Sequence, residues 1–342
     1  MHLSLDWKVL LSSCFLTCWS FCQTKIDSTN KIEDFKRNLV VYSDLGFNSA
    51  PFSISYPFSK EIATLNYKNN FKTFLGLGVA YRWFSLRVGF PILSSFRPTN
   101  KYGSTKQFNF GFDFSILKTY YDLEFKYLEG YSLQKANRWD SNMSPNDIQP
   151  NLVSFNLALN GWYFHDKNFK MNALLGKRAH YTREVHTWYI KSTINFFGLD
   201  NGSNPLIPVQ LQDGNNSKTQ LNNVKSFDFG LIPGYAYVNR INNWQFAGWL
   251  GFGPVIQSKT YSYSSNTRAF LGLAPRYDVR LIFGHSKPTY FIFLVTDFDN
   301  KSIRFSELLF RQYFYSVKLV GGYRFPSKVK MKKESFWKRF KL

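Results

Sequence analysis

The sequence predicts an all-β fold, a closed antiparallel transmembrane β-barrel of about 12 strands with short periplasmic turns and long extracellular loops. Three observations support this prediction. Apolar and polar residues alternate with period two along most of the chain, which is the pattern of half-buried strands. Most of the alternating runs reach the roughly nine residues that a tilted strand needs to cross a bilayer. The connections between the runs alternate between short and long.

Residues 108–116 show the alternation most clearly. One face carries Phe108 and Phe114 with two more phenylalanines between them, and the opposite face carries Asn109 and Asp113. A strand built in this way separates an apolar environment from a polar one. The predicted strands are residues 52–67, 71–82, 84–92, 108–116, 121–127, 152–164, 169–181, 225–238, 244–257, 267–284, 289–298 and 311–325.

The connections give an independent test of the barrel. Outer-membrane barrels have short turns on the periplasmic side and longer loops outside. Short connections fall at 83, 118–119, 165–168, 239–243 and 285–288, and long ones at 93–106, 129–151, 182–224, 258–266 and 299–310. With the short turns in the periplasm, the C-terminus is also periplasmic. Residues 186–197 resemble a strand inside the longest loop and are interpreted as one arm of an extracellular hairpin. If they form a barrel strand instead, the strand count changes.

The N-terminus predicts export. Residues 9–22 form an apolar run of signal-peptide length after Lys8, and Ser20 and Cys22 are small residues suited to cleavage before Gln23. A short membrane anchor and a lipoprotein are the alternatives. The predicted organisation is a signal peptide (1–22), a periplasmic lead-in (23–51), the barrel (52–325) and a basic C-terminal tail (326–342).

Cysteine usage follows from the same prediction. The chain has three cysteines, Cys14, Cys18 and Cys22, and all three lie within the predicted signal peptide. The mature chain would therefore contain neither a disulfide framework nor a catalytic thiolate.

Charge and composition limit the partners. The chain has 43 Lys and Arg against 22 Asp and Glu, a net charge of +21, which suits either a nucleic acid or an anionic lipid. An exported chain whose strands present rows of phenylalanine favours a lipid partner over a nucleic acid. We expect a monomer in the outer membrane of a Gram-negative bacterium, in contact with outer-membrane lipid, lipopolysaccharide and the barrel-assembly machinery, and we expect no nucleic-acid partner.

The inward-facing register contains the candidate functional residues. Positive charges outnumber negative ones there, which predicts an anion-attracting interior for a narrow channel. The favoured alternative is a set of ion-pair networks that rigidify and plug the lumen, because buried charges must be paired. The candidate lumen-lining residues are Arg87, Asp122, Glu124, Lys126, Arg276, Asp278 and Arg280, with Asp228, Asp297 and several aromatic residues also facing inward.

Enzymatic sites are weakly indicated, and we expect no enzyme, cofactor or metal. A lipid- or lipopolysaccharide-modifying enzyme at the outer rim is an alternative function, with His180, His186, Ser192 and Asp200 as the candidate constellation. A soluble periplasmic barrel or sandwich is a further alternative. Oxygen-rich segments that begin at Asp200 and Asp213 lack the ligand spacing of a calcium loop.

Three segments carry a resemblance to known proteins. Residues Tyr315–Phe325 resemble the closing strand of bacterial outer-membrane barrels. Residues Leu65–Trp83 and Phe227–Tyr237 resemble the uncharacterised Bacteroidota family called domain of unknown function 4421 (DUF4421), although Lys68-Asn69 stands where a Pro-Asn pair is expected. The resemblance implies an outer-membrane barrel and brings no activity or catalytic residue.

Overall fold

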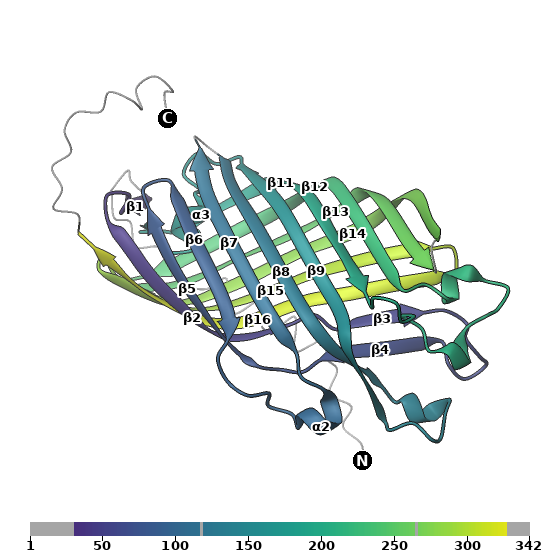
Figure 1. Ribbon diagram of the computed structural model, residues 1–342. Coiled ribbons are helices and arrows are strands. Elements are labelled where there is room, and N and C mark those ends of the chain that lie inside the picture. The colour runs from purple at the N-terminus through teal and green to yellow at the C-terminus, as the bar shows by residue number, and fades with distance from the viewer. Residues whose placement is uncertain (1–30, 117–118, 264–265, 327–342) are drawn as a thin grey trace, which may run out of the picture. The chain divides into compact units, whose positions relative to one another are not determined.

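Antiparallel strands form a closed ring in this computed structural model, which describes residues 31–116, 119–263 and 266–326. Neighbours in the ring pair in sequence order, and β16 pairs with β2 to close it (Figure 1). Within the described residues the ring has twelve strands. They are β2 (Leu39–Ser49), β5 (Thr73–Tyr81), β6 (Phe84–Pro91), β7 (Lys106–Ile116), β8 (Thr119–Gln134), β9 (Asn146–Phe164), β11 (Val185–Asp200), β12 (Asn223–Ile241), β13 (Trp244–Tyr263), β14 (Asn266–Ser286), β15 (Tyr290–Phe305) and β16 (Leu308–Phe325).

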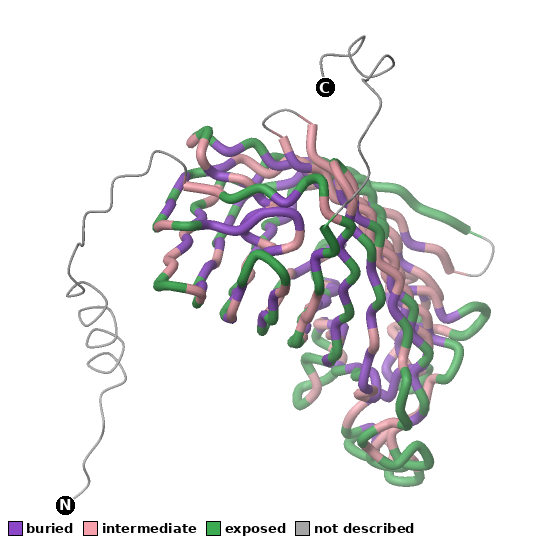
Figure 2. The backbone as a smooth tube through the Cα atoms, turned by 90° about the vertical axis from the view of Figure 1, so that its left-hand side faces the viewer, coloured by how far each residue is buried: buried purple, intermediate pink, exposed green. Residues whose placement is uncertain are grey.

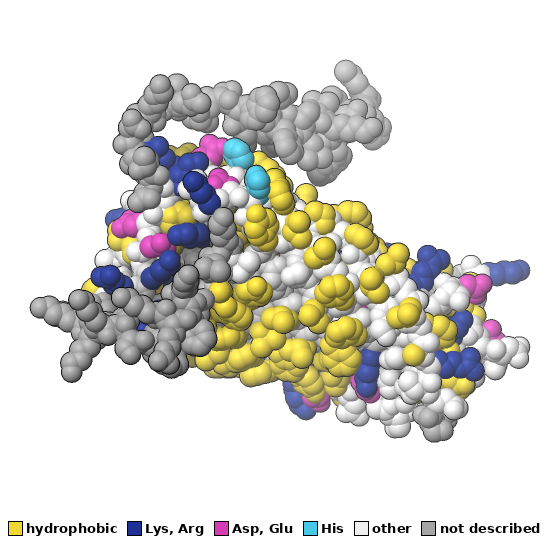
Figure 3. Space-filling model, turned by 90° about the horizontal axis from the view of Figure 1, so that it is seen from above, with side chains coloured by type: hydrophobic (Ala, Val, Ile, Leu, Met, Phe, Trp, Pro, Cys, Tyr) yellow, Lys and Arg dark blue, Asp and Glu magenta, His cyan; other side chains and the backbone are white. Residues whose placement is uncertain are grey.

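An apolar belt covers the outside of the ring. Leu77, Leu250 and Leu319 are each about half exposed, and Figure 3 shows such side chains gathered across the middle of the wall, with charged side chains towards its two ends. A ring of strands pairs backbone groups within the wall, which a hydrocarbon environment requires. The fold is that of a membrane-spanning β-barrel. Among the described residues, no helix is long and apolar enough to cross a bilayer.

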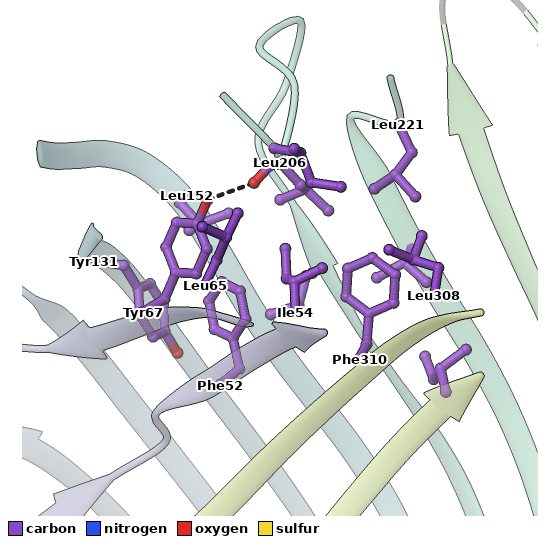
Figure 4. Packing of buried hydrophobic residues seen from close by; sticks show 14 of the residues in the cluster. Phe52, Ile54, Leu65, Tyr67, Tyr131, Leu152, Leu206, Leu221, Leu308 and Phe310 are labelled. Atoms are coloured by element: carbon purple, nitrogen blue, oxygen red, sulfur yellow. Dashed lines mark hydrogen bonds between the residues drawn. The ribbon is translucent and has the colours of Figure 1, made fainter. Parts of the chain in front are cut away.

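One end of the barrel is closed by the cap, which consists of the β3–β4 hairpin and residues 201–222. The hairpin strands β3 (Phe52–Ser55) and β4 (Thr64–Asn69) bridge β16 and β8 beyond the ends of the four shorter strands between them. Tyr67 donates a hydrogen bond to the carbonyl of Leu206 in the overlying segment (Figure 4). The cap thus packs as a buried apolar cluster. Short helices α2 (Thr99–Tyr102), η1 (Ala136–Arg138), η2 (Val209–Leu211) and η3 (Ser217–Thr219) lie in the connections at this end.

The opposite end is filled by the plug, which consists of residues 31–38 and 165–184. Here β1 (Ile32–Asp34) pairs with β10 (Ala179–Tyr181), next to the short helix α3 (Met171–Leu174). Trp249, Phe291 and Phe293 point inward and pack against the plug. All three side chains are buried, as the inward register of β13 and β15 requires. Figure 2 shows the buried segments that occupy this end of the barrel.

The predicted strand number is correct, but two of the predicted strands are not in the ring. Residues 52–67 form the cap hairpin, and the first barrel strand is β2, within the stretch expected to be a periplasmic lead-in. Residues 169–181 belong to the plug, whereas the expected hairpin arm 186–197 lies within the barrel strand β11. The two errors cancel in the count. The barrel therefore begins at Leu39 instead of residue 52.

Several loop lengths also differ from the prediction. The predicted loops 258–266 and 299–310 are mostly strand, because β13 to β16 extend well beyond the apolar belt. The connection between β9 and β11 is long because it folds inward as the plug. The predicted signal peptide and the tail after Pro326 lie outside the described residues.

Candidate functional site: a charged chamber between cap and plug

A polar chamber of about 80 Å³ lies inside the barrel, between the apolar clusters of the cap and the plug. Its volume is room for only a few water molecules. The chamber is lined by as many bases as acids: Lys126, Lys191, Arg276, Arg280 and Lys301 against Asp122, Glu124, Asp278, Asp297 and Asp299. The balanced lining contradicts the expected excess of positive charge at this point of the lumen.

Three ion pairs join the predicted residues of β14 to other strands. Arg276 pairs with Asp228 of β12, and their side chains are 4% and 0% exposed. Asp278 accepts from Lys191 of β11 at 3.1 Å, and Arg280 pairs with Asp297 of β15. A buried charge is tolerated when it is paired and hydrogen-bonded. These pairs therefore link β11, β12, β14 and β15 from inside the barrel.

The predicted residues of β8 are arranged differently. Glu124 and Lys126 pair with each other at 2.9 Å, while no ion pair joins Asp122 to a described residue. Asp122 lies where the chamber meets a second cavity at the plug end. Arg87 lines that second cavity and forms a bidentate pair with Asp44 at 2.5 and 2.6 Å. All seven predicted residues thus line the lumen, and Arg87 shares the second cavity with Asp122, Glu124 and Arg280 without lining the chamber.

The plug is held to the wall by charged groups. Asp113 of β7 accepts from both Lys177 and Arg178 at 2.9 Å, and Arg178 is fully buried. Arg324 of β16 donates to the carbonyls of Gly176 and Lys177. These contacts fix the plug against β7 and β16, which are separated in the ring by β2, β5 and β6.

His180 belongs to the plug and is neutral at physiological pH. Burial, with Arg240 and Arg324 nearby, lowers the pKa of His180 to about 3. Its Nε2 lies 2.8 Å from Glu33, which joins the two segments of the plug. Because the folded pKa lies below the ordinary value near 6.5, the contribution of His180 to stability is complete above about pH 6.5 and is lost as the pH falls towards 3.

The candidate rim constellation is not assembled. His180 lies in the plug, His186 pairs with Tyr237 near the plug end of β11, and Asp200 ends the same strand at the cap. Fourteen residues of extended strand between His186 and Asp200 correspond to roughly 46 Å. Within the described residues, no group of three or more His, Cys, Asp or Glu side chains is placed to hold a metal ion.

The sequence prediction missed three charged residues of the chamber. Lys191 lies in β11, which was interpreted as a loop arm, although its alternation resembled that of a strand. Asp299 and Lys301 lie in a predicted loop and pair at 3.1 Å. Extending the period-two pattern of β15 by a few residues would have placed both side chains inward.

Comparison with known proteins assigns the chain to a family. The family whose description is "Domain of unknown function (DUF4421)" matches residues 25–325. The chain belongs to this family. The match confirms the resemblance stated from the sequence. It covers every described strand, from β1 to β16. No curated protein matches the chain.

Solved structures with a similar arrangement have low sequence identity to this member of DUF4421. The β domain of the Bordetella autotransporter BrkA has a TM-score of 0.37 and 10% identity, with 82% of this chain and 99% of that chain covered. The COG4313 outer-membrane channel from Pseudomonas putida F1 has a TM-score of 0.35 and 9% identity, covering 88% and 100%. The toluene transporter TodX of P. putida has a TM-score of 0.29 and 7% identity, covering 85% and 90%.

Proposed function

We propose that this protein is an integral outer-membrane barrel that acts as a gated passage for small polar solutes. The polar chamber between two closed ends carries the proposal. A lumen that served only as a scaffold could be filled with apolar side chains, whereas this one retains paired charges around a cavity. Because five bases face five acids there, the proposal includes no preference for anions.

The plug is the moving part in this proposal, and its end of the barrel faces the periplasm. Its strands β1 and β10 pair with each other and with no described strand of the ring, and polar contacts to Asp113 and Arg324 help to hold it in place. Water can replace these polar contacts, and the apolar side chains of the plug must also separate from Trp249, Phe291 and Phe293 for the plug to move. Release of the plug would connect the chamber to the periplasm.

Single-channel recording in planar bilayers tests the passage. We expect the full chain to be closed for most of the time and Asp113→Asn to open more often, since the neutral side chain loses its ion pairs to Lys177 and Arg178. Asp200→Asn, which removes the exposed pair with Lys225, is the matched control and should behave like the parent. In a second variant, residues 166–187 are deleted and replaced by an Asn-Gly turn that joins His165 to Trp188. These two residues are already adjacent, because the backbone N–H of His165 donates to the carbonyl of Trp188. This variant should conduct continuously.

A structural barrel that presents its cap is the second candidate function, favoured by the close packing of the cap and the small chamber. Silent recordings from both plug variants, in protein that still shows the gel shift between boiled and unboiled samples, would support this second candidate and exclude the passage. A chain that fractionates as soluble and shows no gel shift would contradict both candidates. An enzymatic role is not proposed.

A further inference from the structure

The hydrogen-bond ladder between β14 and β15 ends halfway along the two strands. Their pairing runs from Ser286 opposite Phe291 to Asp278 opposite Asp299 and stops there. Beyond this point β14 continues to Asn266 paired only with β13, and β15 continues to Phe305 paired only with β16. Figure 2 shows the outer part of β14 as an exposed arm that stands off the wall. We name this break the β14–β15 seam.

A proline accounts for the position of the seam. The backbone N–H of Tyr277 is directed at β15, where it donates to the side-chain oxygen of Asn300 at 2.7 Å. Residues two apart in a strand direct their N–H groups to the same side. Pro275 would therefore have to donate to β15, and it has no N–H. The ladder ends where its next donor is missing.

Side chains replace the lost backbone donors along β15. The carbonyl of Ser302 accepts from the side-chain amide of Gln257 at 2.9 Å, and the carbonyl of Arg304 accepts from Lys259. Both donors come from β13 and reach past the displaced β14. Gln257 is 1% exposed. Since a buried backbone group without a partner is costly, these contacts make the seam a stable part of the structure.

The chamber extends to the seam. Its lining includes Tyr277, Val279, Phe298 and Tyr315, which belong to the outward register of β14, β15 and β16. Val279 pairs with Phe298, and Phe298 pairs with Tyr315, so these three form one row across the last paired part of the wall, next to the seam.

The seam begins in the cap-side half of the membrane-spanning wall. Eight residues of β14 separate Asp278 from Ser286 at the plug end, a rise of about 20 Å along the membrane normal at an ordinary strand tilt, against an apolar band of ~25 Å. Leu271 and Leu273 lie further along the displaced arm, beyond the apolar band, and are 79% and 74% exposed. The seam therefore begins inside the apolar band, close to its cap-side edge, where it borders the lipid.

We propose that the seam is a lateral opening through which a small amphipathic molecule passes between the chamber and the cap-side leaflet. The aromatic side chains of Tyr277, Phe298 and Tyr315 border the route for its apolar part. The ion pair of Asp299 and Lys301 inside the chamber offers partners for its polar end. This lateral route is distinct from passage along the barrel axis. Of the proposed function, it requires only that the barrel is inserted in the membrane.

A cysteine reporter in the chamber tests the opening. Ser316 lines the chamber and is 7% exposed, and no cysteine occurs after Cys22. The full chain with Cys14, Cys18 and Cys22 changed to serine and with Ser316→Cys is placed in phosphatidylcholine vesicles. We expect pyrene maleimide dissolved in the bilayer to label the reporter faster than a sulfonated, water-soluble maleimide does.

Gln257→Ala supplies the second measurement. Loss of its contact with Ser302 should widen the seam and speed labelling from the bilayer by about tenfold, the effect of one buried hydrogen bond. The matched control is Gln245→Ala, another buried glutamine of β13, which donates to the carbonyl of Leu174 at the plug end and should leave the rate unchanged.

Two results would overturn the lateral opening while leaving the proposed function intact. The first is a reporter that bilayer-dissolved pyrene maleimide does not label, in protein that retains the boiled-versus-unboiled gel shift. The second is equal labelling rates for Gln257→Ala and Gln245→Ala. Absence of the gel shift in the parent chain would instead contradict membrane insertion and, with it, both proposals.

Discussion

At the scale of single residues, the interior depends on charges that are paired across strands. Alternation in the sequence placed seven charged residues inward, and in the structure all seven line the chamber or the cavity beside it. Their ion-pair partners could not be predicted from the sequence, because a pair such as Arg276 and Asp228 joins positions 48 residues apart. Which inward side chains meet depends on the stagger between strands, and no local pattern encodes this.

Breaking the Arg276–Asp228 pair should be strongly destabilising. Asp228→Ala leaves the buried guanidinium of Arg276 without its counter-charge, which costs about 3–5 kcal/mol. Chemical unfolding of the inserted barrel, followed by the gel shift, measures the change in the free energy of unfolding. Glu129→Ala removes the exposed pair with Lys106 and should cost at most about 1 kcal/mol. Equal effects of the two substitutions would show that the buried pair does not stabilise the barrel.

At the scale of elements, local alternation identifies strands but does not say which ones join the ring. Residues 52–67 and 39–49 both alternate, and only β2 contributes to the closed ring, whereas the other segment folds into the cap. The plug segment 169–181 contains enough apolar residues to resemble a strand, yet its apolar side chains fill the barrel end. A lipid-facing strand and a lumen-filling segment bury similar surfaces, so their composition is similar.

A glycine controls the bend of β8 where its partner changes from β7 to β4. Gly130 has φ +94°, and the pairing with β9 shifts register between Glu129 and Tyr131. A Cβ at this position would lie 2.1 Å from the carbonyl oxygen of Ser104. Gly130→Ala should therefore lower the free energy of unfolding by about 2–3 kcal/mol.

Gly202→Ala is the matched control for this prediction. Gly202 also has a positive φ, +64°, but a Cβ there would meet nothing within 4 Å. Its substitution should cost only about 1 kcal/mol, the backbone penalty alone. A Gly130→Ala variant as stable as Gly202→Ala in the same unfolding assay would contradict the close approach of β8 to residue 104.

At the scale of the whole molecule, the apolar belt predicts where charge is tolerated. Leu250 is 61% exposed in the middle of the belt on β13, so Leu250→Lys should destabilise the inserted barrel by about 2–4 kcal/mol. Ser258 lies in the same outward register eight residues further along the strand, near the cap. Ser258→Lys should cost no more than ~1 kcal/mol. Unfolding from lipid vesicles measures both changes, and equal costs would show that the belt does not face lipid.

The sequence by itself determined the fold class and the inward and outward registers, because period-two alternation is a property of each strand alone. Only the tertiary structure decided which segments form the ring, how the cap and plug close its ends and where the ladder fails. Those features depend on contacts between distant residues, such as Arg178 with Asp113 and Gln257 with the carbonyl of Ser302. Pro275 was visible in the sequence, but its consequence required knowing which neighbour its missing N–H would have faced.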